Sequence, residues 1–133
     1  MKPIFLALAL IASAVHAAED PDSTPCDGIE NDKQTLECAS YNKTTAAQLL
    51  NDNYHSLQER LANLYGSAPS ELADITARLK DAQQKWEKLR DADCAIETFP
   101  AVSGSKAYAI AQNDCLARMS DERSEFLESI GQE

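Results

Sequence analysis

The sequence is poor in the residues that bind metals and catalyse reactions. It has two histidines and four cysteines in 133 residues, and 11, 55 and 20 residues separate successive cysteines. Zinc sites use cysteine or histidine pairs only about two to four residues apart. His55, which we expect to be an exposed helix residue, lies near Asp52 without a nucleophile or second acid–base group. We therefore expect no metal, no cofactor and no catalytic residues.

A hydrophobic run long enough to span a bilayer is also absent. The longest apolar run, residues 4–15, is too short for a membrane span. It follows Lys2 and precedes Val15-His16-Ala17, an arrangement typical of a secretory signal peptide, residues 1–17. Cleavage after Ala17 would leave one domain, residues 18–133. No cysteine follows this site directly, so the sequence predicts a periplasmic or secreted protein without a membrane anchor.

Basic residues are scarce. Lys and Arg number 12 against 22 Asp and Glu, which gives a net charge of −10. Loss of Lys2 with the signal peptide makes the charge −11. Such a chain repels nucleic acid and meets cationic partners faster. Its acidic groups, such as Asp91 and Asp93, are expected to be solvated faces, one of which could dock a cationic enzyme.

Alternating strand patterns are absent, and three stretches show helical spacing instead. The first helix is predicted at residues 33–65, with Asp32 as N-cap and weaker helix formers at 41–45 where it can kink or break. Gly66 ends it, Pro69 begins a second helix, and a third covers residues 105–130. The residues expected to face inward are Leu50, Tyr54, Leu57, Leu61 and Leu64; then Leu72, Ile75, Leu79, Ala82, Trp86, Leu89 and Ile96; then Tyr108, Cys115, Met119, Phe126 and Ile130.

These stretches predict an all-α fold, an elongated up-down-up three-helix bundle preceded by an irregular N-terminal arm at residues 18–31. An even number of cysteines in an oxidising compartment predicts two disulfides that staple the bundle. The favoured pairs are Cys26–Cys38 and Cys94–Cys115, which are local in sequence. The rival is Cys38–Cys94 with Cys26–Cys115, because Cys38 and Cys94 lie at the same end of the first hairpin.

Four short segments, in order along the chain, carry a family resemblance. They are Leu50-Asn51-Asp52-Asn53-Tyr54 (L-N-x-x-Y), Ala82-Gln83-Gln84-Lys85-Trp86 (A-Q-x-x-W), Arg90-Asp91-Ala92-Asp93-Cys94 (R-D-x-x-C), and Cys115-Leu116 with Arg123 and Leu127 downstream. With the four cysteines, this pattern resembles the LprI-type lysozyme-inhibitor N-terminal domain. The resemblance implies a secreted bacterial domain and, for one lipid-anchored branch, inhibition of lysozyme at the cell envelope.

The motif side chains are interpreted as a structural skeleton rather than a binding site. Trp86, on an apolar stripe, is expected in the core. Arg90 and Arg123 are expected to pair with carboxylates such as Asp91. Gln83 and Asn51 are expected to form hydrogen bonds between helices, and Tyr54 belongs to the inward stripe of the first helix.

Two function hypotheses follow. The first is a periplasmic or envelope binding protein that inhibits a cationic lysozyme, and the second is a structural or adaptor envelope protein with no effect on lysozyme. An enzyme is disfavoured, because glycosidases need two carboxylates about 5–10 Å apart across a cleft, which slim bundles rarely form.

Overall fold

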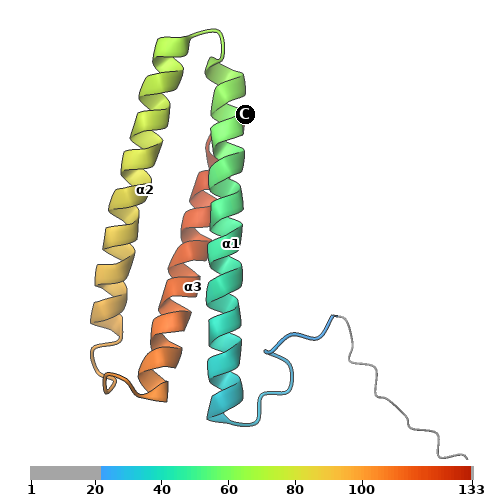
Figure 1. Ribbon diagram of the computed structural model, residues 1–133, viewed down its shortest axis with the longest axis vertical. Helices are drawn as coiled ribbons and strands as arrows, with labels where there is room; N and C mark the ends of the chain where they lie inside the picture. Colours follow the sequence, from blue (N-terminus) through green and yellow to red (C-terminus); the bar gives the residue numbers. More distant parts are fainter. Residues whose placement is uncertain (1–21, 133) are drawn as a thin grey trace, which may run out of the picture.

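The computed structural model describes residues 22–132 and contains three helices in an up-down-up order. They are α1 (Asp32–Tyr65), α2 (Pro69–Glu97) and α3 (Lys106–Ser129), and residues 22–132 contain no β-strand. Figure 1 shows α1 and α2 joined by a tight turn, and the α2–α3 loop at the opposite end, beside the start of α1. The predicted all-α three-helix bundle is confirmed, whereas the predicted signal peptide lies outside the described residues.

The start of α1 differs from the prediction by one residue. Asn31, not Asp32, is the N-cap: its backbone is extended, and its side-chain oxygen accepts hydrogen bonds from the amides of Lys33 and Gln34. Asp32 instead occupies the first turn, where its charge complements the helix dipole. The helix runs without a break through residues 41–45, where the hydroxyl of Thr44 bonds the carbonyl of Ser40.

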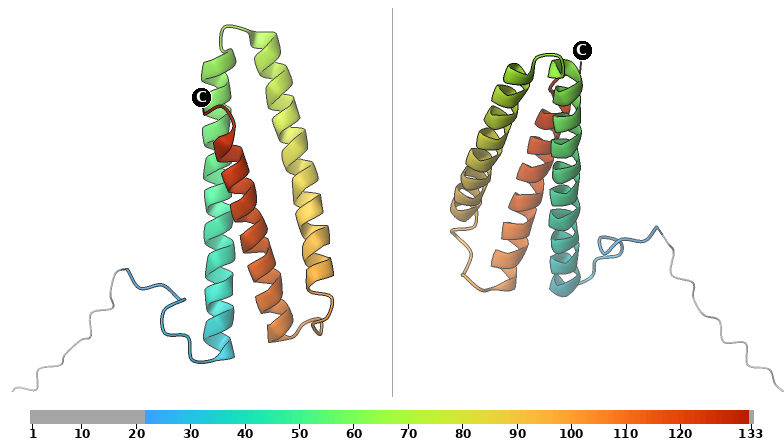
Figure 2. Two further views of the ribbon diagram at one scale, coloured as in Figure 1. Left: turned by 180° about the vertical axis from the view of Figure 1, so that it is seen from behind. Right: turned by 45° about the horizontal axis from the view of Figure 1, so that its top comes forward.

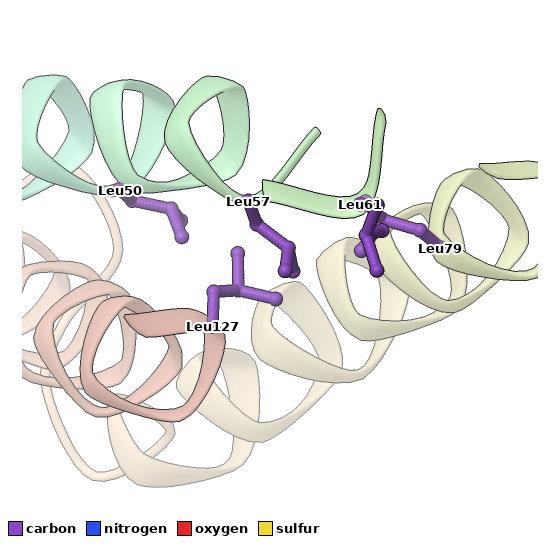
Figure 3. Close-up of a cluster of buried hydrophobic side chains, with 5 residues drawn as sticks. All are labelled: Leu50, Leu57, Leu61, Leu79 and Leu127. Carbon is purple, nitrogen blue, oxygen red and sulfur yellow. The ribbon is translucent and has the colours of Figure 1, made fainter. Parts of the chain in front are cut away.

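The apolar core lies in the half of the bundle near the α1–α2 turn. Its buried members come from all three helices and are Leu50, Leu57, Leu61, Leu79 and Leu127 (Figure 3). Partly buried side chains pack around them: Tyr54, Tyr65, Leu72, Ile75, Trp86 and Ile130. Trp86 is thus at the margin of the core rather than inside it.

Helices α1 and α3 pack closely along their shared length because small side chains lie between them. The buried residues there include Ala39, Ala46, Ala117, Ser120 and Ser124. The side-chain amide of Asn53 donates to the hydroxyl of Ser124 at 2.8 Å. In addition, the guanidinium of Arg60 on α1 donates to the carbonyls of Leu127, Glu128 and Ile130 at the end of α3.

Helix α2 is held more loosely and diverges from α1 away from their connecting turn (Figures 1 and 2). Only two of its residues, Leu79 and Cys94, are buried. The inward side of α2 runs through Leu72, Leu79, Trp86, Arg90 and Cys94, all buried or partly buried. Successive positions in this series are four or seven residues apart and therefore lie on one stripe.

Several apolar residues predicted to face inward are in fact exposed. Their exposed fractions are 58% for Leu64, 56% for Leu89, 74% for Ile96 and 54% for Phe126, and Ala82 is exposed as well. On α2 the cause is rotation: Cys94 faces α3, which turns Leu89 and Ile96 away from the bundle. On α3 the inward face is built from Cys115, Ala117, Ser120, Ser124 and Leu127, not from Phe126.

Both favoured disulfides are present. Cys26 is bonded to Cys38, with 4.6 Å between their Cα atoms, and this bond ties the arm to the first turns of α1. Cys94 is bonded to Cys115, with a Cα–Cα distance of 5.7 Å, and both cysteines are fully buried. The α2–α3 loop lets α3 begin beyond the end of α2, so that its third turn reaches Cys94.

Removal of the buried disulfide is expected to destabilise the protein far more than removal of the arm disulfide. Cys94→Ala/Cys115→Ala should lower the free energy of unfolding by about 3 kcal/mol, a melting-temperature decrease of more than about 10 °C. Cys26→Ala/Cys38→Ala should lower the melting temperature much less, because the arm can detach without unfolding the bundle. Thermal unfolding followed by circular dichroism measures both melting temperatures. Equal decreases for the two variants would contradict the larger contribution of the Cys94–Cys115 bond.

Candidate functional site

The divergence of α1 and α2 opens a groove of about 470 Å³ between them, and most of the family-motif side chains line it. Its lining residues are Ala47, Leu50, Asn51 and Tyr54 from α1, and Lys80, Gln83, Gln84, Trp86, Glu87 and Arg90 from α2. The L-N-x-x-Y and A-Q-x-x-W segments therefore meet across one groove. We call it the α1–α2 groove.

Trp86 is the centre of this arrangement, and two guanidinium groups lie against its ring. The guanidinium carbon of Arg90 is 5.1 Å from the ring centroid, and that of Arg123, which comes from α3, is 5.8 Å away. Both distances are in the range of cation–π attraction. Arg123 also lies 5.1 Å from the centroid of Phe126. The guanidinium of Arg123 on α3 therefore connects that helix to Trp86 on α2.

Arg123 has no carboxylate partner among the described residues, which corrects the expectation of an ion pair. Its Nε instead donates to the side-chain oxygen of Gln83 at 3.1 Å. Partial burial lowers the pKa of Arg123, because desolvation disfavours the charged form, yet a guanidinium stays protonated in proteins. The π faces and the amide oxygen therefore stabilise a partly buried cation where an ion pair was predicted.

The remaining motif residues fulfil their expected roles to different degrees. Gln83 forms the expected hydrogen bond between helices, and Arg90 forms an ion pair with Asp91 at 2.7 Å. Asn51 is exposed at the edge of the groove; within the described part of the chain its side chain makes no hydrogen bond to another helix. Its neighbour Asn53 makes that connection instead.

The lining of the α1–α2 groove contains one carboxylate, that of Glu87, and no histidine, cysteine or serine. The two-carboxylate arrangement of glycosidases is therefore not found there. His55 lies exposed on α1 and contacts Gln58. Across residues 22–132, no group of three or more His, Cys, Asp or Glu could hold a metal ion.

Sequence reasoning missed an exposed apolar segment in the α2–α3 loop. Phe99 is 86% exposed and Val102 is 77% exposed. The loop beneath them is nonetheless tied down: Thr98 is buried, and its hydroxyl donates to the carbonyl of Cys94 at 2.7 Å. The signal in the sequence is the presence of two large apolar side chains in an otherwise polar loop.

Comparison with known proteins identifies the family. The family model described as "Lysozyme inhibitor LprI" matches residues 26–127. The chain belongs to this LprI family. The structure is similar to the crystal structure of a DUF1311 family protein from Pseudomonas putida, with a TM-score of 0.71 and 42% sequence identity. That match covers 78% of this chain and 97% of the other. No curated protein matches the chain.

The segment matched by the LprI family model covers nearly the whole helical body. It begins at Cys26 and ends at Leu127, so it includes both disulfides, α1, α2 and all but the last two residues of α3. Among residues 22–132, none of the helices has the length and hydrophobicity of a membrane span.

The Arg123 contacts are expected to matter more for stability than an exposed ion pair does. Arg123→Ala should lower the free energy of unfolding by about 1–2 kcal/mol, because it removes the cation–π contacts and leaves Gln83 without its donor. The control Lys85→Ala, which breaks only the exposed pair with Asp81, should cost less than about 0.5 kcal/mol. Urea denaturation measures both; a neutral Arg123→Ala would argue against the stacked arrangement.

Proposed function

We propose that this protein is an extracytoplasmic binding protein that inhibits a lysozyme-type cell-wall hydrolase. The observation that carries the proposal is the match of residues 26–127 to the family of LprI lysozyme inhibitors. The two disulfides support a location outside the cytoplasm, since such bonds persist in oxidising compartments. The signal-peptide pattern at residues 1–17 supports the same location.

Charge supports the choice of partner. Lysozymes are commonly cationic, and this chain carries 22 acidic against 12 basic residues. Opposite charges accelerate the encounter of two proteins and favour correct orientation, and salt weakens both effects.

A clearance assay tests the proposal. Purified residues 18–133 should slow the clearing of a bacterial cell-wall suspension by lysozyme at micromolar concentrations. The inhibition constant should rise at least threefold between about 50 and 300 mM NaCl, because the added ions screen the attraction. Lysozyme alone at each salt concentration is the control. Unimpaired clearance at tens of micromolar protein would refute the proposal.

The alternative function is that of a structural or adaptor protein of the envelope. The exposed apolar side chains at the end of α2 and in the α2–α3 loop favour it, because apolar patches on monomers often mark protein interfaces. It predicts an envelope protein recovered after cross-linking, together with unimpaired lysozyme. The clearance assay therefore separates the two functions.

A further inference from the structure

Several large apolar residues at the end of α2 and in the following loop are exposed to solvent. Leu89, Ala92 and Ile96 are three and four residues apart, so they share the outward stripe of α2, and all three are exposed. The amide of Phe99 bonds the carbonyl of Ile96, which continues the stripe into the loop. We call the four large side chains, Leu89, Ile96, Phe99 and Val102, the apolar tip.

The apolar tip is exposed to a degree unusual for such side chains. The exposed fractions rise from 56% at Leu89 to 86% at Phe99. Leaving these groups in water forfeits the stability that their burial would bring, roughly 1.5–3 kcal/mol for each large side chain. The exposure of these side chains brings the monomer no compensating gain in stability. A partner that covers them is the best explanation.

The scaffold beneath the tip is fixed before any partner binds. The Cys94–Cys115 disulfide joins α2 to α3 at this end, and Thr98 anchors the loop through its backbone amide and its hydroxyl, both bonded to the Cys94 carbonyl. The amides of Ala101 and Ser105 close two further turns within the loop. Preorganised apolar side chains lose little entropy on binding, which favours affinity.

Charge decides which partner fits. Asp93 and Glu97 lie on α2 beside the stripe, as do Lys85 and Lys88. Glu97 forms an ion pair with Arg118, whereas Asp93 makes no ion pair among the described residues. A second copy of this chain would bring the same acidic flank and the same net negative charge, so electrostatic repulsion opposes self-association. A cationic protein is instead attracted by the net negative charge of this chain, and the apolar side chains with polar groups around them match the usual centre and rim of a protein interface.

We propose that the apolar tip is the surface through which this protein binds its cationic target, with Phe99 as the central anchor. This inference rests on the proposed lysozyme inhibition and adds the contact surface to it. The partner surface is an apolar depression edged by Lys and Arg side chains, because those features complement Phe99, Val102 and the acidic flank.

Two variants with the same charge change test the proposal. Phe99→Asp should raise the inhibition constant for lysozyme at least tenfold, as expected for loss of a central aromatic anchor. The added negative charge would by itself favour a cationic target, so a loss reports the missing apolar contact. Leu49→Asp, on the opposite α1–α3 side and 49% exposed, is the matched control and should change the constant less than twofold. Phe99→Leu should keep the constant within about threefold of the original.

Each outcome decides the proposal. Circular dichroism should show equal helicity for all variants, because neither Phe99 nor Leu49 is buried. Equal inhibition by the unaltered protein and Phe99→Asp would overturn the apolar tip as the contact surface while leaving lysozyme inhibition intact. No inhibition by the unaltered protein would refute the function and the surface together. A dimer in sedimentation velocity that Phe99→Asp dissociates would assign the tip to a second copy instead.

Discussion

Cys94 on α2 and Cys115 on α3 are bonded and fully buried at the end of the bundle where few apolar side chains hold α2. The bond requires Cys94 to face α3. Because side chains are spaced at regular angles around a helix, fixing the direction of one also fixes the directions of its neighbours over the next few turns. This single constraint therefore sets the direction of every side chain in the second half of α2. It brings Trp86 and Arg90 toward the groove and turns Leu89 and Ile96 to solvent.

The two surfaces of interest are consequences of the same loose packing of α2. Because α2 diverges from α1 (Figure 1), the motif residues of both helices line a groove instead of a closed core. Arg123 reaches from α3 to Trp86 and Gln83 and supports that wall of the groove. On the outer side of α2, Leu89 and Ile96 are exposed, and with Phe99 and Val102 of the α2–α3 loop they make up the apolar tip.

Several residues of the LprI-type motif make contacts within or between the helices. Tyr54 and Trp86 pack against the core margin, and Gln83 and Arg123 connect α2 to α3. Such residues position α2 without belonging to the apolar tip. In the proposed mode of action, the motif and the disulfide hold a rigid frame, and the exposed loop residues, which lie outside the motif, carry the contact with the target.

Local sequence determined the helices, their order, the turn at Gly66–Pro69 and the local disulfide pairs, because helical periodicity, turn residues and loop lengths act over short stretches of chain. It also determined the acidic charge and the family. Only the tertiary structure decided which side of each helix is buried. The pattern of large apolar residues predicted that Phe126 faces inward on α3. Instead, Ala117, Ser120 and Ser124 are buried against α1, because close helix packing selects small side chains. The exposure of Phe99 and Ile96 likewise depends on the rotation that the Cys94–Cys115 bond imposes, a relation between distant segments that no local pattern contains.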